Sequence, residues 1–163
     1  QVGKTTLFQQ IVRKYSLGGK ENGPSVKPSV NYVESRIALE NNIYKLIDTP
    51  SFRLRPQTQI EKEGKKQIQE LLKKSDLILW LVEEVDNEIL LLSKYLKKIA
   101  TPKILVVNKA DVEGGGEESF FSFRVLRLEF WVAISALKTT NLDQLIKQII
   151  MKKSTNTNND VYK

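Results

Sequence analysis

Four short groups of polar and small residues could do chemistry in this chain. Gly3-Lys4-Thr5-Thr6 stands at the start of a helical pattern, and Asp48 follows a short apolar strand pattern. Asn108-Lys109-Ala110-Asp111 and Ser135-Ala136-Leu137 each follow a further apolar run. Ammonium, hydroxyl and carboxylate groups in loops after strands suit the binding of a phosphorylated ligand and a hard cation.

The first group, Gly3-Lys4-Thr5-Thr6, matches the second half of the phosphate-binding loop G-x-x-x-x-G-K-[ST]. Backbone N–H groups of such a loop surround phosphates, and the helix N-terminus adds a positive dipole. We expect Lys4 to reach the β- and γ-phosphates and the Thr5 hydroxyl to bind Mg²⁺. The first glycine of the motif would precede Gln1, so we expect a truncated chain that lacks half of this loop and the strand before it. Alone, this match is weak.

The second candidate, Asp48, begins the segment Asp48-Thr49-Pro50-Ser51 directly after the strand pattern of residues 43–47. A carboxylate at a strand end beside a phosphate-binding loop commonly holds Mg²⁺ through water. The alternative for a lone aspartate is the capping of a turn.

The third group, Asn108-Lys109-Ala110-Asp111, gives the strongest signal. Guanine offers two donors on one edge, and a fixed carboxylate at Asp111 can accept from both. Adenine has an acceptor there, so hydrogen bonds to a charged group, at about 1.5–3 kcal/mol each, would select guanine. We expect Lys109 to lay its alkyl stem along the base and Asn108 to tie neighbouring loops together.

The fourth group, Ser135-Ala136-Leu137, follows the last apolar run. Small residues there would let the backbone N–H of Ala136 approach guanine O6. Alone the group carries little information, and its weight comes from being the last of four ordered groups.

In this order and at these spacings, the four groups resemble the Era/EngA (Der) group of bacterial P-loop GTPases, and most of all the first GTPase domain of EngA. The resemblance covers residues 1 to about 151 and is carried by residues 46–51, 71–82 and 102–111. It implies a protein that binds GTP or GDP with Mg²⁺ and hydrolyses GTP as a conformational switch in assembly of the large ribosomal subunit. The partner implied is a ribosomal subunit or rRNA. Residues 1–153 would be the GTPase domain without its N-terminal strand, and 154–163 a polar tail or interdomain linker.

Three positions depart from the pattern of that family. Ser51 stands where the third motif has a glycine whose amide contacts the γ-phosphate. Ser29 is the best match for the threonine that binds Mg²⁺, with Ser25 as a fallback. Gln1 stands where the family has an asparagine that helps some members bind K⁺, so a role for K⁺ is left open.

The residue after Ser51 bears on turnover. Phe52 follows Ser51, where Ras-like proteins have a glutamine that orients water, so we expect slow intrinsic hydrolysis that depends on a cation or a partner. One alternative is a module that binds guanine nucleotides without turnover. Another is a degenerate or truncated remnant that binds nothing.

Hydrophobic periodicity predicts the elements that position these groups. Strands alternate with helices, and the later strands are apolar throughout, so we expect an α/β fold with a mostly parallel central sheet covered on both faces. Ligands of such sheets bind beyond the carboxyl ends of the strands. Helices are expected after Gly3 and over residues 57–74, 88–99, 119–126 and 142–149, and strands over 32–39, 43–47, 77–82, 104–107 and 130–134. We expect a mobile loop over 20–31 and a disordered tail or linker from residue 154.

The composition limits the chemistry further. The chain has 163 residues, no cysteine and no histidine, which excludes a disulfide scaffold, a thiol nucleophile and a Ser-His-Asp triad. No apolar run approaches the roughly 18 residues of a membrane span, and no signal peptide opens the chain, so we expect a cytoplasmic protein. Its formal net charge is +7, and we interpret its lysine pairs, such as Lys65-Lys66 and Lys152-Lys153, as solvated helix faces, with a shared nucleic-acid surface as the alternative.

Overall fold

The computed structural model describes residues 3–17, 25–26, 32–108, 124–126 and 130–160. The chain divides into two compact units, Gly3–Leu71 and Leu72–Lys163. Each unit has its own three-stranded sheet. None of the helices in the described ranges carries an apolar stretch of the length needed to cross a bilayer.

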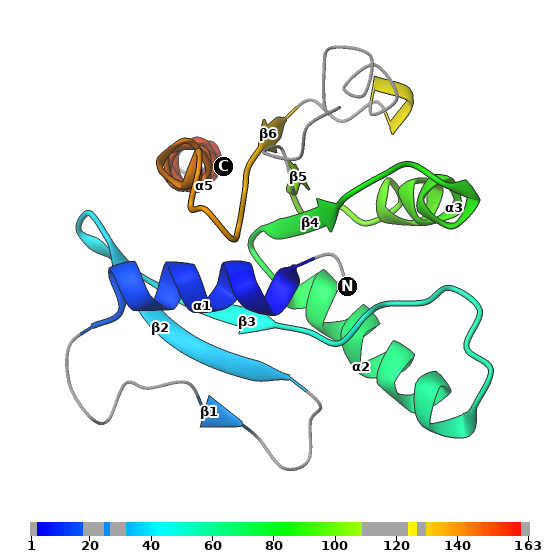
Figure 1. Cartoon of the computed structure of the whole chain (residues 1–163). Helices are drawn as coiled ribbons and strands as arrows, with labels where there is room; N and C mark the ends of the chain where they lie inside the picture. Colours follow the sequence, from blue (N-terminus) through cyan, green and yellow to red (C-terminus); the bar gives the residue numbers. More distant parts are fainter. Residues whose placement is uncertain (1–2, 18–24, 27–31, 109–123, 127–129, 161–163) are drawn as a thin grey trace. The chain divides into compact units, whose positions relative to one another are not determined.

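The first unit combines two helices with an antiparallel sheet (Figure 1). The sheet has the order β1-β2-β3, and β2 and β3 form a hairpin in which Leu39 pairs with Asn42. Glu40, in the two-residue connection, has a left-handed φ of 53°, as tight hairpin turns require. α1 lies along β2 and β3 and buries an apolar stripe against them. The elements are α1 Lys4–Tyr15, β1 Ser25–Val26, β2 Val33–Leu39, β3 Asn42–Asp48 and α2 Gln59–Lys74.

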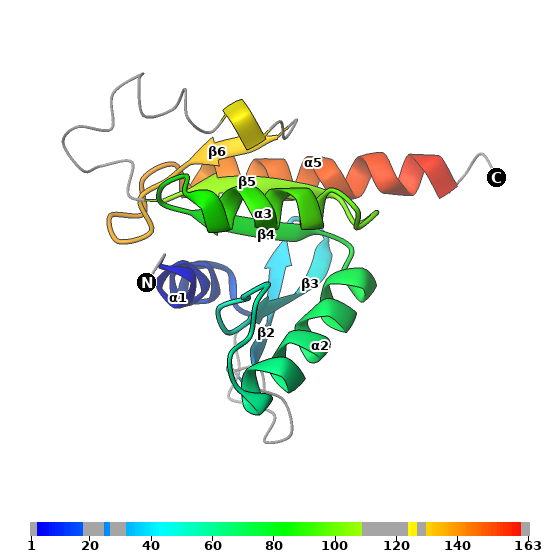
Figure 2. The same ribbon diagram turned by 90° about the vertical axis from the view of Figure 1, so that its right-hand side faces the viewer.

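The second unit is built on a parallel sheet of order β4-β5-β6. α3 and α5 cover its opposite faces, as the two perpendicular views show (Figures 1 and 2). Because both faces are covered, four of the five residues of β5 are buried. The elements are β4 Ile78–Val82, α3 Asn87–Leu96, β5 Lys103–Val107, the short 3₁₀ helix η2 Arg124–Leu126, β6 Trp131–Ala133 and α5 Leu142–Asp160.

The expected α/β class is confirmed, and so is a parallel sheet with helices on both faces, which is the sheet β4-β5-β6 of the second unit. The expected hairpin is confirmed too, and within the described ranges it belongs to a separate antiparallel sheet in the first unit. A two-residue turn can join only antiparallel strands, whereas β4, β5 and β6 are joined by long crossovers, which parallel strands need.

Two expectations about single segments were wrong. The polar segment 20–31 contains β1, because Ser25 and Val26 pair with Glu34 and Val33 of β2. The backbone of α5 continues to Asp160, so residues 154–160 extend the helix rather than begin an irregular tail. The expected helix over 119–126 is described only at residues 124–126, as η2. The division into a GTPase domain and a linker stays a prediction.

Candidate functional site

The N-terminus of α1 brings the first predicted group into position. Gly3 has φ 75° and ψ 20°, a left-handed conformation that glycine adopts without a steric penalty. Its carbonyl accepts from the Leu7 N–H at 2.9 Å, which begins the helix. Lys4, Thr5 and Thr6 therefore occupy the first turn of α1, where the helix dipole favours anions.

Two side chains of this turn contact the segment that follows β3. The Thr5 hydroxyl donates to Asp48 Oδ2 at 2.8 Å. Lys4 Nζ donates to Ser51 Oγ at 3.3 Å. Asp48 and Ser51 lie 43 and 47 residues from their partners in sequence, so the tertiary structure brings together four residues that the sequence singled out separately.

The ammonium of Lys4 sits in a partly desolvated place. Burial lowers the pKa of Lys4, and the carboxylate of Asp48 acts in the opposite direction. A charge that has lost part of its hydration gains more from an anionic partner than a fully solvated one does. Lys4 is therefore suited to bind a phosphate oxygen.

The donor set beside Lys4 fits Mg²⁺. Thr5 and Asp48 offer a hydroxyl and a carboxylate oxygen that lie 2.8 Å apart, and Mg²⁺ prefers hard oxygen ligands. Mg²⁺ in nucleotide sites takes one or two protein carboxylates and completes its shell with phosphates and water.

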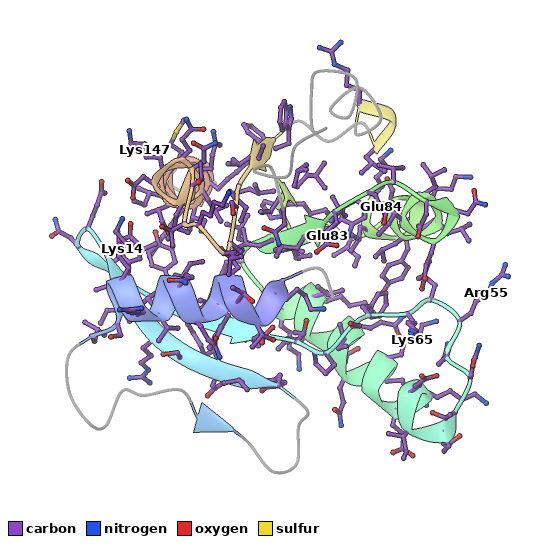
Figure 3. The ribbon with its side chains drawn as sticks, in the orientation of Figure 1. Lys14, Arg55, Lys65, Glu83, Glu84 and Lys147 are labelled. Atoms are coloured by element: carbon purple, nitrogen blue, oxygen red, sulfur yellow. The ribbon has the colours of Figure 1, made fainter. Side chains whose placement is uncertain are left out.

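The loop after β3, residues 49–58, is fastened to α2 at two points. Lys65 Nζ donates to the carbonyl oxygen of Leu54 at 2.6 Å, and Figure 3 shows Lys65 reaching from α2 toward the loop that carries Arg55. At the start of α2, Glu61 Oε2 accepts from the Gln57 N–H at 2.6 Å and from the Thr58 N–H at 3.2 Å.

The second fastening is a capping box, because the Thr58 hydroxyl accepts in return from the Glu61 N–H at 3.1 Å. Hydrogen bonds from Gln57, first, and then Thr58 lower the pKa of the Glu61 carboxyl. The loop therefore has a fixed end on α2 and, at Ser51, a contact with Lys4.

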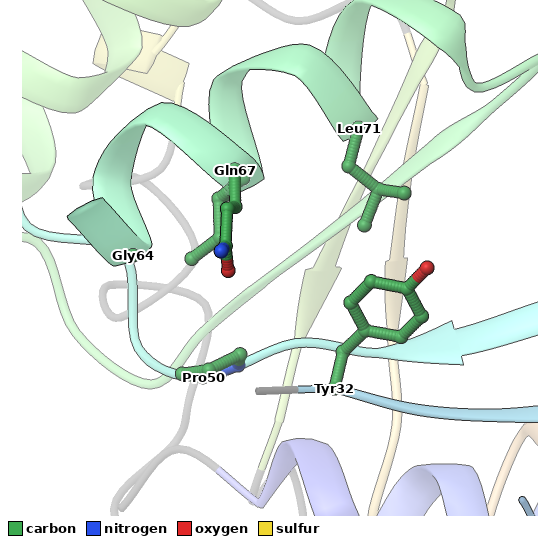
Figure 4. A pocket seen from close by; sticks show the side chains of 6 residues that line it. Tyr32, Pro50, Gly64, Gln67 and Leu71 are labelled. Carbon is green, nitrogen blue, oxygen red and sulfur yellow. The ribbon is translucent and has the colours of Figure 1, made fainter. Parts of the chain in front are cut away.

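A small apolar pocket lies beside this loop. Figure 4 shows Tyr32 and Pro50 on one side and Gly64, Gln67 and Leu71 of α2 on the other; Ile68 completes the lining. A Cβ atom built on Gly64 would meet no heavy atom within 4 Å. The lining of this pocket is almost entirely apolar, so it offers little that could bind a phosphate.

The second unit holds Asn108, the first residue of the third predicted group, in a buried setting. Asn108 follows β5 directly and is 6% exposed. Its Oδ1 accepts from the Ala136 N–H at 2.9 Å, and its own N–H donates to the Val82 carbonyl at 2.9 Å. Asn108 thus joins the end of β5 to the turn after β6 and to the end of β4. The expected approach of the Ala136 N–H to guanine O6 stays a prediction.

The turn after β6 is held by its own hydrogen bonds. Ser135 is buried, and its hydroxyl accepts from the Lys138 N–H at 3.1 Å. Asn141 Nδ2 donates to the Ala133 carbonyl at 3.0 Å. Leu137 is 78% exposed, so it adds no packing to the turn.

Four of the predicted site residues lie outside the described residues: Gln1, Ser29, Lys109 and Asp111. Nothing of the Ser25 side chain is described either.

Sequence reasoning missed the residues that hold the loop 49–58. The pattern Thr58-x-x-Glu61 before a helix is a recognisable capping box and could have been found. Lys65 could not, because its acceptor is a backbone carbonyl 11 residues away in a loop. The interpretation of the lysine pairs as solvated faces was wrong for Lys65, which is partly buried, and for Lys152, whose Nζ lies 3.2 Å from the centre of the Phe130 ring.

The amino-acid sequence is similar to those of known GTPases. The family model described as 50S ribosome-binding GTPase matches residues 1–109. GTPase Era of Caldicellulosiruptor saccharolyticus is 35% identical over 159 residues, covering 91% of this chain and 50% of that protein. GTPase Der of Thermotoga neapolitana is 30% identical over 157 residues, covering 93% and 35%. The chain thus spans about half of the Era relative and about a third of the Der relative.

Solved structures share the fold. Era in complex with MgGDPNP and nucleotides 1506–1542 of 16S ribosomal RNA superposes with a TM-score of 0.74 at 23% identity, over 93% of this chain and 53% of that one. The G domain of the Thermotoga maritima FeoB iron transporter superposes with a TM-score of 0.69 at 20% identity, over 94% of this chain and 92% of that one.

Proposed function

The chain belongs to the 50S ribosome-binding GTPase family, and on that premise we propose that it binds GTP and GDP with Mg²⁺ and hydrolyses GTP as a conformational switch. The observation that carries the proposal is the meeting of Lys4 and Thr5 with Ser51 and Asp48 at the N-terminus of α1. A lysine, a hydroxyl and a carboxylate at a helix N-terminus are what a nucleotide phosphate and its cation require.

In this proposal the phosphates bind to the first turn of α1. Lys4 binds phosphate oxygens, and Gly3, Lys4 and Thr6 offer backbone N–H groups. Thr5 and Asp48 hold Mg²⁺, with Ser29 as the third candidate ligand. The bound cation would neutralise charge that develops on the β- and γ-phosphate oxygens.

The guanine base is assigned to the third group, Asn108-Lys109-Ala110-Asp111. Asp111 accepts from the two donors on the guanine edge, and Lys109 covers the base with its alkyl stem. The support from the described residues is indirect. Asn108 is buried and bonded to the backbone on both sides, so it gives the segment that leads to Lys109 a rigid start. Ser135, Ala136 and Leu137, in the turn that Asn108 contacts, are assigned to the base as well, with the Ala136 N–H approaching guanine O6.

For hydrolysis the chain supplies position and charge rather than a covalent group. Lys4 and the loop amides stabilise charge on the oxygen between the β- and γ-phosphates as the bond to the γ-phosphorus breaks. Because Phe52 offers no group to orient the attacking water, we expect slow intrinsic turnover, with K⁺ at Gln1 as an open option.

The cellular role that goes with this activity is assembly of the large ribosomal subunit in the cytoplasm, with a ribosomal subunit or rRNA as partner. It is supported by the description of the family and by the Era and Der relatives. The test is co-sedimentation of the full-length protein with purified ribosomal subunits in the presence of GDP or GDPNP.

The nucleotide proposal is tested by titrating fluorescent GDP, with Mg²⁺, into the full-length protein and competing with unlabelled GDP or ATP. We expect displacement by GDP and none by ATP. Asp111→Asn should shift the preference from guanine toward xanthine nucleotides, because an amide puts a donor where the carboxylate put an acceptor. Unchanged base selectivity in this variant would overturn the assignment of Asp111.

A second candidate is a module that binds the nucleotide without turnover. It is favoured by Ser51, which stands at the family's glycine position and contacts Lys4. Single-turnover GTP hydrolysis with Mg²⁺ and K⁺ separates the two candidates, since a binding module releases GTP unchanged.

A further inference from the structure

Ser51 combines an unusual position with a specific contact. Its side chain is exposed, yet its hydroxyl lies 3.3 Å from Lys4 Nζ and accepts a hydrogen bond from it. An exposed hydroxyl needs no protein partner, because water satisfies it at little cost. The contact is therefore not needed for folding, and it places a hydroxyl beside the Lys4 ammonium.

The Lys4 ammonium and the Ser51 hydroxyl each carry hydrogen-bond donors that this contact does not use. An ammonium carries three N–H donors, and a hydroxyl carries one O–H donor beside its two acceptor lone pairs. Once Ser51 accepts from Lys4, its own proton can go to a third group. A single anionic oxygen placed next to both would then receive one hydrogen bond from Lys4 and one from Ser51. Glycine or alanine at this position could supply no such side-chain donor.

The loop keeps the Ser51 hydroxyl near this place. Three residues beyond Ser51, the Leu54 carbonyl is bound by Lys65 of α2 at 2.6 Å. The capping box of Thr58 and Glu61 then fixes the end of the loop. A hydroxyl on a segment braced in this way loses less conformational freedom when it binds a ligand.

We propose that the Ser51 hydroxyl is a specificity-determining group that makes this protein favour guanosine triphosphate over guanosine diphosphate, by donating to an oxygen of the terminal phosphate while it accepts from Lys4. The inference rests on the proposed nucleotide binding. It differs from that proposal because it assigns a ligand contact to a side chain, at a position where the resembling family has none.

The test is calorimetric titration of the full-length protein with GDPNP and, separately, with GDP, both with Mg²⁺. Ser51→Ala keeps the backbone N–H and removes only the hydroxyl. A hydrogen bond to a charged group corresponds to about a tenfold change in affinity or more, so we expect GDPNP to bind about tenfold more weakly. GDP binding should change less than about twofold. Ser51→Thr, which keeps the hydroxyl, should restore the preference.

The matched control is Ser16→Ala, which removes an exposed hydroxyl at the other end of α1, about 18 Å away along the helix. It should leave both affinities unchanged. Equal loss for GDPNP and GDP in Ser51→Ala, or no loss for either, would overturn the inference while leaving the proposed function intact. If the unaltered protein binds neither nucleotide, the proposed function fails and the inference fails with it.

Discussion

In the first unit Lys4 and Thr5 make their contacts through side chains that are exposed or half-buried, whereas in the second unit Asn108 makes its contacts from a buried position. The partners differ in kind as well. Lys4 and Thr5 bind side-chain oxygens of Ser51 and Asp48, but Asn108 binds the backbone of Ala136.

The comparison teaches how exposed and buried polar contacts differ in their freedom to change partner. Exposed side-chain contacts can be exchanged for ligand oxygens at little cost, because water can take up any group that is released. A buried side chain bonded to the backbone cannot change partner without leaving a buried donor unsatisfied. The contacts of Lys4 and Thr5 can therefore be exchanged for contacts to a ligand, whereas the contacts of Asn108 stay fixed.

The sheets explain why the two groups differ in burial. β3 is only half-buried along most of its length, so the segment after Asp48 begins near solvent. β5 is buried from Ile104 to Val107, so Asn108 leaves it inside the core.

The largest expected effect tests whether the exposed contacts of Lys4 in the first unit serve ligand binding rather than stability. Lys4→Ala should weaken GDP binding by about a hundredfold or more, because at least two charge-assisted hydrogen bonds to phosphate are lost. The melting temperature should change little, since the contact to Ser51 is exposed. Fluorescent-GDP titration and thermal unfolding measure the two effects. Lys14→Ala, an exposed position in the last turn of the same helix, is the control and should leave GDP binding unchanged.

The next effect tests whether the buried contact of Asn108 in the second unit stabilises the fold. Asn108→Ala should lower the free energy of unfolding by about 1–3 kcal/mol, because the buried Ala136 N–H loses its acceptor. Urea unfolding followed by tryptophan fluorescence measures this change. The control is Leu137→Ala, at an exposed position in the turn that contains Ala136. It should change the free energy of unfolding by less than about 0.5 kcal/mol. Equal effects for the two variants would break the comparison.

A smaller effect, of opposite sign, separates stability from binding in the first unit. Gly64→Ala should raise the free energy of unfolding by about 0.5–1 kcal/mol, because alanine is the better helix former and its Cβ meets open space. GDP affinity should stay unchanged. Destabilisation of this variant in urea would show that the pocket beside Gly64 cannot accept even a methyl group.

The smallest effect depends on pH. The backbone bonds that Glu61 accepts lower its pKa in the folded protein below the ordinary 4.5, so the unfolded chain binds the proton more tightly. The stabilisation is complete above pH 4.5 and is lost as the pH falls through the folded value. Glu61→Gln should therefore reduce stability near neutral pH, with a difference from the unaltered protein that shrinks as the solution is acidified.

Urea midpoints between pH 3 and 7 measure this slope. Glu63→Gln is the control, because the Glu63 carboxylate accepts from the side chain of Gln59 rather than from the backbone. A difference between Glu61→Gln and the unaltered protein that does not vary with pH would contradict the role of the capping box.

Much of the secondary structure could be predicted, because it depends on local pattern. The apolar run before Asn108 and the polar break at Glu40-Asn41 gave β5 and the hairpin to within a residue or two. β1 could not be predicted, since its two residues form a strand only by pairing with β2. The helical backbone of residues 154–160 was missed because asparagine and threonine are weak helix formers.

The sequence by itself determined the chemistry that is available: which residues carry an ammonium, a hydroxyl or a carboxylate, and which apolar runs end beside them. Only the tertiary structure decided the pairs. Lys4 meets Ser51 across 47 residues, and Asn108 meets Ala136 across 28. The physical reason is that a hydrogen bond depends on distance and direction in space, whereas sequence spacing constrains distance only within a turn, a helix or a hairpin.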